Sequence, residues 1–164
     1  HLHGGSVHRR APGLKVPAGS ARVTPPRYRR PMAETKQKGS VAEIVVLEEA
    51  VRRGYRVSIP YGEDGLYDLV VDRSGRLERV QCKYVQSDGR VLVVKCVSTN
   101  NWGTRRYTVA DVEWLAVFDA TTNRCYFIPS ALIGSGRSVL HLRLDPARNG
   151  QERRVRYAAD FLEW

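Results

Sequence analysis

Apolar positions first recur along the chain at the spacing of an α-helix. Ser40-Val-Ala-Glu43 matches a capping box, in which a serine and a glutamate three residues later satisfy each other's backbone N–H groups. Apolar side chains then follow one helical face at Ile44, Leu47 and Val51, and Gly54 supplies a stop signal. The pattern predicts a first helix that begins at about Ser40 and ends at Gly54.

Segments rich in β-branched and aromatic residues follow this helix and are separated by glycine-containing turns. They predict consecutive strands at residues 55–60, 66–72, 77–85 and 90–97. Further along the chain we expect a polar, basic loop over residues 102–106, a helical turn over 108–111, apolar runs at 114–118 and 125–129, and a helix near 155–162. This order predicts an α/β fold with a central mixed β-sheet flanked by helices.

The first 31 residues differ in composition from the rest of the chain. They hold five of the eight prolines, little apolar content and no acid, so they cannot bury enough surface to offset the entropy of ordering. We expect a disordered basic tail over residues 1–35 and a folded domain over residues 36–164. The tail could be a nucleic-acid-binding arm, a transit peptide, or sequence upstream of the natural start. Met32, the only methionine, favours the last of these, because it opens a start-like segment.

Charge and cysteine content narrow the class of protein. A net charge of +10 and an isoelectric point near 9.9 indicate a polyanionic partner, most often nucleic acid. Residues 1–31 hold seven of the basic side chains, so the remaining 133 residues carry only +3. No run of about 18 apolar residues is present, so we expect no membrane-spanning helix. Cys82, Cys96 and Cys125 form no C-x-x-C pair, which predicts free thiols and a reducing, cytoplasmic setting.

Three polar residues are expected to meet on the second and third predicted strands. If Ser74-Gly75 is a two-residue turn between them, the register places Asp68 opposite Gln81. Side chains alternate between the faces of a sheet, so Gln81 and Lys83 share a face and Asp68 joins them. A longer turn would change this register. Because the neighbouring residues are apolar, a carboxylate and an ammonium placed here need compensating partners.

Asp68 followed by Gln81-x-Lys83 resembles the PD-(D/E)XK nuclease superfamily, with a glutamine where the second acid usually stands and Tyr67 where a proline usually precedes the first. The similarity runs from Lys36 to Trp164. It points to small single-domain endonucleases with Gln-x-Lys, a group that includes an intron-encoded homing endonuclease and is distantly similar to archaeal Holliday-junction resolvases. Other matching positions are Glu43, Gly54-Tyr55, Pro60-x-Gly62, Tyr107 with Asp111, Tyr126-x-Ile128-Pro129, Leu142-Arg143-Leu144 and Asn149-x-Gln151.

The resemblance implies a restriction-endonuclease-like core that hydrolyses phosphodiester bonds in DNA with Mg²⁺, with Mn²⁺ as a substitute. It implies catalytic roles for Glu43, Asp68, Gln81 and Lys83. The metal ligands would be Asp68, the Gln81 side-chain oxygen and the backbone carbonyl of Cys82, with Glu43 reaching the metal through water. Lys83 would orient or deprotonate a water molecule, or stabilise the developing charge. One carboxylate fewer than usual predicts weaker metal binding.

Each of these residues also has a structural explanation. Glu43 fits the capping box without any catalytic role. Asp68 could form a buried ion pair with Lys83 that fixes the hairpin. Gln81 could be a cross-strand hydrogen-bonding amide. Two further acids at the hairpin ends are expected to be solvated charges, namely Asp72 and Glu78.

Residues outside this constellation are candidates for contacts with DNA. They are Lys38, Ser98, Asn100, Asn101, Trp102, Arg105, Arg106, Asn149, Gln151 and Arg153. The alternative for these residues is a solvated polar surface. Expected partners are double-stranded or branched DNA and further copies of the chain, as a homodimer or homotetramer, because one site per chain cuts one strand at a time. A catalytically inactive nucleic-acid-binding module with a nuclease-like fold is the alternative function, and an adaptor that binds through its tail is a weaker one.

Overall fold

The helix that opens the fold starts earlier than its sequence pattern predicts. The computed structural model describes residues 34–62, 65–100, 103–134, 137–146 and 155–164, all within a unit that spans Pro31–Trp164. Helix α1 spans Glu34–Arg52. Ser40 lies inside it and donates its Oγ hydrogen to the carbonyl oxygen of Lys36 at 3.2 Å, so the predicted capping box is wrong. An ion pair of 2.7 Å between Glu34 and Lys38, one turn apart, favours the additional helical turn.

The end of α1 is the one that the sequence predicts. Gly54 has a φ of +81°, a conformation that glycine adopts without strain. Its N–H donates to the carbonyl of Val51 at 2.9 Å, and the N–H of Tyr55 donates to the carbonyl of Ala50 at 3.1 Å. These two bonds form a Schellman motif and satisfy carbonyls that the helix end leaves free. The predicted tail, residues 1–35, lies outside the described residues except for its last two, which belong to α1.

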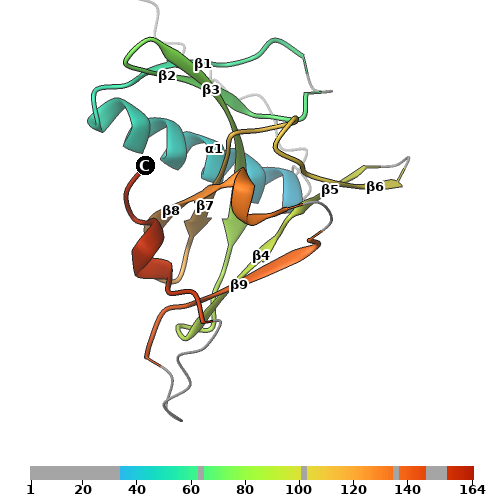
Figure 1. Ribbon diagram of the computed structural model, residues 1–164, viewed down its shortest axis with the longest axis vertical. Coiled ribbons are helices and arrows are strands. Elements are labelled where there is room, and N and C mark those ends of the chain that lie inside the picture. The colour runs from blue at the N-terminus through green and yellow to red at the C-terminus, as the bar shows by residue number, and fades with distance from the viewer. Residues whose placement is uncertain (1–33, 63–64, 101–102, 135–136, 147–154) are drawn as a thin grey trace, which may run out of the picture. The chain divides into compact units, whose positions relative to one another are not determined.

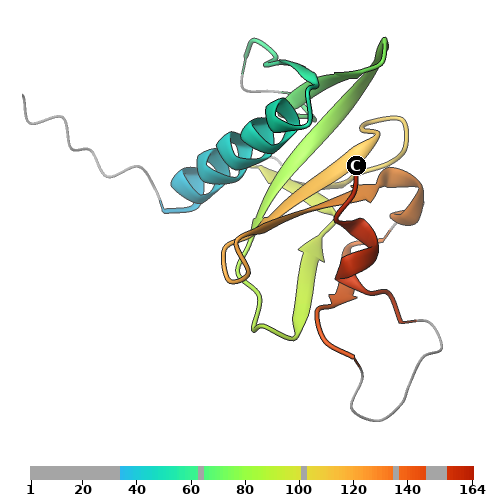
Figure 2. The ribbon, with the colours of Figure 1, turned by 90° about the vertical axis from the view of Figure 1, so that its left-hand side faces the viewer.

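A five-stranded mixed sheet forms the centre of the fold, in the order β1-β2-β3-β7-β8. The strands are β1 (Arg56–Ser58), β2 (Leu69–Arg73), β3 (Arg76–Val85), β7 (Trp114–Asp119) and β8 (Arg124–Pro129). Only β3 and β7 run parallel, and the other neighbours are antiparallel. Helix α1 packs across one face of this sheet (Figures 1 and 2), where Val46 and Ala50 meet Val80 and Phe127 in a buried cluster. The predicted central mixed sheet is confirmed.

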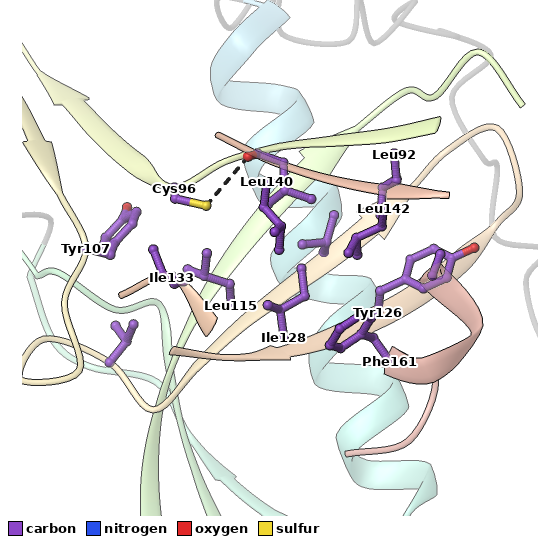
Figure 3. Packing of buried hydrophobic residues seen from close by; sticks show 14 residues of the cluster. Leu92, Cys96, Tyr107, Leu115, Tyr126, Ile128, Ile133, Leu140, Leu142 and Phe161 are labelled. Atoms are coloured by element: carbon purple, nitrogen blue, oxygen red, sulfur yellow. Dashed lines mark hydrogen bonds between the residues drawn. The ribbon is translucent and has the colours of Figure 1, made fainter. Parts of the chain in front are cut away.

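The other face of the sheet is covered by strands instead of a helix. Strand β4 (Val91–Lys95) pairs antiparallel with β9 (Val139–Arg143), and together they enclose a second buried cluster (Figure 3). Strand β9 is not among the strands that the sequence predicts. A 3₁₀ turn, η1 (Ser130–Leu132), follows β8. The helix expected near 155–162 is a second 3₁₀ turn, η2 (Ala158–Phe161), so the flanking helices of the prediction reduce to α1 in the described residues.

The basic segment expected to be a loop is half of a hairpin. Strand β5 (Val97–Asn100) pairs antiparallel with β6 (Gly103–Arg106). The residues of β6 are all exposed, so they carry no apolar alternation from which a strand could be predicted. The Thr108–Asp111 turn is present, with the Asp111 N–H donating to the carbonyl of Thr108 at 3.0 Å.

The predicted β2–β3 register is confirmed. Ser74 and Gly75 have φ values of 55° and 85°, as a two-residue turn of this kind requires, and Leu69 pairs with Val80. One expectation at this hairpin is wrong. Glu78 is only 3% exposed and is neutralised by Arg73 at 3.1 Å and Arg76 at 3.3 Å, so it is not a solvated charge.

The described residues contain three free thiols and no helix suited to crossing a membrane. Cys82, Cys96 and Cys125 form no disulfide. In the described part of the chain, no helix combines the length and the apolar character that a membrane crossing requires.

Candidate active site

Asp68 and Gln81 meet at the point where β2 begins beside the middle of β3. The backbone N–H of Asp68 donates to the carbonyl of Val80 at 2.9 Å, and Val80 is also the partner of Leu69 in the last β2–β3 pair. Its Oδ2 accepts two hydrogen bonds, from the Gln81 Nε2 at 2.5 Å and from the Cys82 backbone N–H at 2.7 Å. The carboxylate of Asp68 therefore takes the place of a strand residue opposite Cys82.

Burial makes Asp68 an unusually weak acid. Loss of hydration raises its pKa from the ordinary 3.8 to about 6, and the negative charge of Glu43 acts in the same direction. The N–H of Cys82, the positive charge of Lys83 and the Gln81 amide oppose this rise but do not cancel it. A carboxylate held partly dehydrated beside another carboxylate is stabilised by a cation. Such a combination is typical of functional sites.

Glu43 reaches the site from α1. Its side chain is exposed, and the buried positions of the helix are Ala42, Val46 and Ala50, so Glu43 does not point into the core. It lies instead at the wall of a cavity of about 380 Å³ that Asp68 also lines. The capping explanation for Glu43 no longer applies, because α1 begins at Glu34. What remains is an acid placed close enough to Asp68 to perturb its titration.

Lys83 does not pair with Asp68. Its Nζ donates to the backbone carbonyl of Val97 at 3.2 Å and to the hydroxyl oxygen of Tyr107 at 3.0 Å, and it lies 4.8 Å from the centroid of the Tyr107 ring. Among the described residues, the ion pairs within 4.0 Å include none between Lys83 and Asp68. The explanation of Asp68 and Lys83 as a simple ion pair is therefore not supported. The hydrogen-bond partners of Lys83 are neutral, so no direct ion pair within 4.0 Å cancels its charge in the described residues.

The oxygen atoms around Gln81 fit a hard divalent cation. Its Nε2 lies within 2.5 Å of Asp68 Oδ2 and 3.3 Å of the Cys82 carbonyl oxygen. A half-turn of the amide exchanges nitrogen for oxygen and gives a set of carboxylate, amide and carbonyl oxygens, which Mg²⁺ prefers. The described residues contain no cluster of three or more His, Cys, Asp or Glu side chains that could hold a metal. A cation bound here would have the Asp68 carboxylate as its charged ligand and would depend on the neutral Gln81 and Cys82 oxygens for the rest.

The candidate DNA-binding residues are spread over several elements. Arg105 and Arg106 lie exposed on β6, where Arg105 Nη2 pairs with Asp111 Oδ1 at 2.6 Å. Lys38 on α1 pairs with Glu34. Ser98 and Asn100 belong to β5. Five candidates lie outside the described residues: Asn101, Trp102, Asn149, Gln151 and Arg153.

A groove beside the β5–β6 hairpin joins Arg106, a candidate from the sequence, to residues that the sequence did not single out. Its volume is about 670 Å³, and its polar lining consists of Lys95, Thr99, Thr104, Arg106 and Ser138. Arg106 Nε donates to Ser138 Oγ at 3.3 Å, which fixes the guanidinium against the wall. None of the described residues that line the groove is acidic. Two cations among hydroxyl groups suit phosphate oxygens. Ser138 could not be placed in advance, because β9, which it precedes, was not predicted.

Comparisons with known proteins agree with the geometry. A family model described as PD-(D/E)XK endonuclease matches residues 33–164. Among solved structures, the chain is similar to a bacterial homing endonuclease, I-Ssp6803I, with a TM-score of 0.58 and 23% identity over 79% of this chain and 88% of that one. This likeness concerns the fold. A search of curated proteins finds no match. Because the family model covers the whole of the chain beyond its first 32 residues, the chain belongs to the PD-(D/E)XK endonuclease family.

Proposed function

We propose that the chain is a DNA endonuclease that depends on a divalent cation and hydrolyses phosphodiester bonds to leave 5′-phosphate and 3′-hydroxyl ends. The observation that carries the proposal is the convergence of the Asp68 carboxylate, the Gln81 amide and the Cys82 carbonyl in one partly dehydrated place. A structural hairpin does not require a carboxylate whose pKa is raised to about 6. A site that binds a cation does benefit from oxygens that water solvates poorly.

Asp68, Gln81 and the Cys82 carbonyl would hold the cation, with Glu43 reaching it through water. When bound, Mg²⁺ or Mn²⁺ would neutralise phosphate charge and make a water molecule more nucleophilic. Hydrolysis forms a bond from water oxygen to phosphorus and breaks the bond from phosphorus to O3′, with a proton passing to the leaving oxygen. Lys83 brings a positive charge with neutral partners near Asp68, where it would orient the attacking water or stabilise the added negative charge.

The groove and the β5–β6 hairpin support DNA as the substrate. Val97 lines the groove and also holds Lys83, so the basic lining begins next to the proposed reacting group. Lys95 and Arg106 would bind backbone phosphates on one side of the scissile bond. Contacts of this type position a duplex without reading its sequence.

A homodimer or homotetramer is the proposed assembly, in a cytoplasmic setting. The proposed chemistry cleaves one strand per site, and each chain offers one such site. Two copies related by symmetry would cut both strands of a duplex or two strands of a branched junction.

The second candidate function is a nucleic-acid-binding module without catalysis. The observation that favours it is Gln81, which leaves Asp68 as the sole charged ligand on the two strands of the site. Under this alternative, the chain binds DNA equally well with and without a cation, and the Asp68 substitution changes nothing in the DNA.

Incubation with DNA separates the two functions. The purified chain is mixed with supercoiled plasmid, with a library of palindromic sites and with a four-way junction, each with Mg²⁺, with Mn²⁺ and with EDTA. Nicking or cutting that needs the cation, is lost in Asp68→Ala and falls to a low residual rate in Lys83→Ala supports the endonuclease. Asp160→Ala, which removes an exposed acid on η2, is the matched control and should cleave normally. Tight binding without cleavage under either cation would contradict the proposal and favour the binding module.

A further inference from the structure

Tyr107 is a buried residue whose hydroxyl faces Lys83. Only 2% of its surface is exposed, and it belongs to the buried cluster that contains Cys96 and Leu115 (Figure 3). The hydroxyl oxygen accepts a hydrogen bond from Lys83 Nζ at 3.0 Å. A hydroxyl buried with its ring requires a partner, and Lys83 supplies it.

Both hydrogen-bond acceptors of Lys83 belong to the base of the β5–β6 hairpin. Val97 is the first residue of β5 and pairs with Arg106, the last residue of β6. Tyr107 follows at once, and its backbone N–H donates to the carbonyl of Cys96 at 3.1 Å. The hairpin exposes Arg105 and Arg106 to solvent, and the residues at the base of the same hairpin bind the Lys83 ammonium.

We propose that Tyr107 is the positioning residue for Lys83 and that, through Tyr107 and the Val97 carbonyl, the β5–β6 hairpin sets where the ammonium stands in the active site. The inference rests on the proposed endonuclease function. A lysine side chain has four rotatable bonds, and most of its freedom must be removed before it can act on one water or one phosphate oxygen. The hydroxyl, the carbonyl and the ring face remove that freedom without neutralising the charge.

The hydrogen-bond partners of Lys83 are neutral, and this is why we infer that they position the ammonium and do not simply neutralise a buried charge. An acid at 3 Å would hold Lys83 equally well and would cancel the charge on which the proposed reaction depends. Tyr107 lies in the rigid core cluster, whereas the hairpin beyond it is exposed. DNA bound along the hairpin would thus be held at a fixed position relative to Val97 and Tyr107, the residues that position Lys83.

Tyr107→Phe tests the proposal because it removes the hydroxyl and keeps the ring in the core. We expect kcat at saturating DNA to fall by about tenfold, because losing one hydrogen bond to a charged group has an effect of about this size. The Kd for DNA in EDTA should stay unchanged. The matched control is Tyr126→Phe. Tyr126 is also 2% exposed and lies in the same cluster (Figure 3), but its hydroxyl contacts Thr122 at 3.3 Å and is not one of the hydrogen-bond partners of Lys83. Its kcat should equal that of the unaltered chain.

A double-substitution cycle separates positioning from general weakening. On a Lys83→Ala background, Tyr107→Phe should lower the residual rate no further, because the hydroxyl has lost the group it positions. A tenfold loss that persists without Lys83 would overturn the proposal. So would an unchanged kcat in Tyr107→Phe, or a fall of equal size in Tyr126→Phe.

A spectroscopic readout keeps this inference distinct from the proposed function. The chain has few lysines, namely Lys15, Lys36, Lys38, Lys83 and Lys95, so ¹³Cε-labelled lysine gives a sparse NMR spectrum in which Lys83→Arg identifies the Lys83 signal. The Tyr107 ring should shift that signal upfield in the unaltered chain, and Tyr107→Phe should move it toward the exposed lysines, with no change in Tyr126→Phe. If the chain cleaves no DNA, the proposed function fails, and an unshifted Lys83 signal would overturn the positioning as well.

Discussion

Replacing Asp68 with asparagine should make the protein more stable. Asp68→Asn keeps an oxygen for the Cys82 N–H and removes the charge, and the Gln81 amide can turn to accept the new NH₂ group. The pKa of about 6, against 3.8 ordinarily, means that the folded chain binds the Asp68 proton more tightly than the unfolded chain does. A difference of about two units corresponds to about 3 kcal/mol at about 1.4 kcal/mol per unit.

The pH dependence gives this prediction its sign. Above pH 6 the folded state carries the cost of the ionised Asp68 in full, and the cost disappears as the pH falls from about 6 towards 3.8. Asp68→Asn should therefore raise the free energy of unfolding by up to about 3 kcal/mol at pH 8, by about half as much at pH 5, and not at all where both states are protonated.

Urea denaturation followed by tryptophan fluorescence, with EDTA present, measures the difference at each pH. Asp88→Asn is the control of opposite sign, because the backbone N–H groups of Val91 and Arg90 lower the pKa of that exposed carboxyl. Its substitution should cost stability as the pH rises. An Asp68→Asn protein that is less stable than the unaltered chain at pH 8, or equally stabilised at pH 5 and pH 8, would refute the reasoning.

Three further outcomes are expected. Lys95→Ala combined with Arg106→Ala should weaken DNA binding and reduce the slope of log K against log salt by about 2, measured by fluorescence anisotropy, because two phosphate contacts are lost. Gln81→Glu should raise the affinity for Mg²⁺ in calorimetry and lower stability without metal, since a second carboxylate then lies against Asp68. Gly54→Ala should lower stability by about 1 kcal/mol, since its φ is +81°, whereas Gly39→Ala should raise it by up to about 1 kcal/mol, since Gly39 lies within α1 with open space around its Cα.

Each of these three predictions has a control or a result that would contradict it. Arg52→Ala removes an exposed cation of α1 that lies outside the groove, so it should leave the salt slope nearly unchanged. An unchanged slope in the Lys95 and Arg106 double variant would remove the groove from the DNA path. Equal Mg²⁺ affinity in Gln81→Glu would show that residue 81 is not a ligand. Thermal melting distinguishes the two glycine variants. Melting temperatures that move in the same direction in both would contradict the roles given to Gly54, which ends α1, and Gly39, which lies within it.

The sequence predicts the part of the site that a single local rule governs. Ser74-Gly75 specifies a two-residue turn, the turn fixes the β2–β3 register, and the register places Asp68 beside Gln81. The end of α1 follows equally from Gly54. These features depend on neighbours in sequence, and a local pattern is enough to predict them.

Three other features could not be predicted from the sequence pattern, each for a different physical reason. Lys83 looked like a partner for Asp68, but its acceptors come from Val97 and Tyr107, whose approach is set by the fold of a hairpin with no apolar alternation. The start of α1 was misplaced because the serine of an apparent capping box can also bond back to a carbonyl within a helix, as Ser40 does. Glu78 was expected in solvent because its two arginine partners cannot be inferred from composition.

The early end of β2 has a consequence for how molecules of this protein meet one another. Pairing between β2 and β3 stops at Leu69 and Val80, so in the part of the chain that the structure describes no strand pairs with β3 from Cys82 onward on that side, and a side chain bonds the Cys82 N–H instead. An unpaired strand edge of this kind normally invites a strand from another molecule and leads to aggregation. Asp68 and Lys83 place two charges along that stretch, so the residues proposed to cut DNA also protect an open edge of the sheet from pairing with its counterpart in another copy.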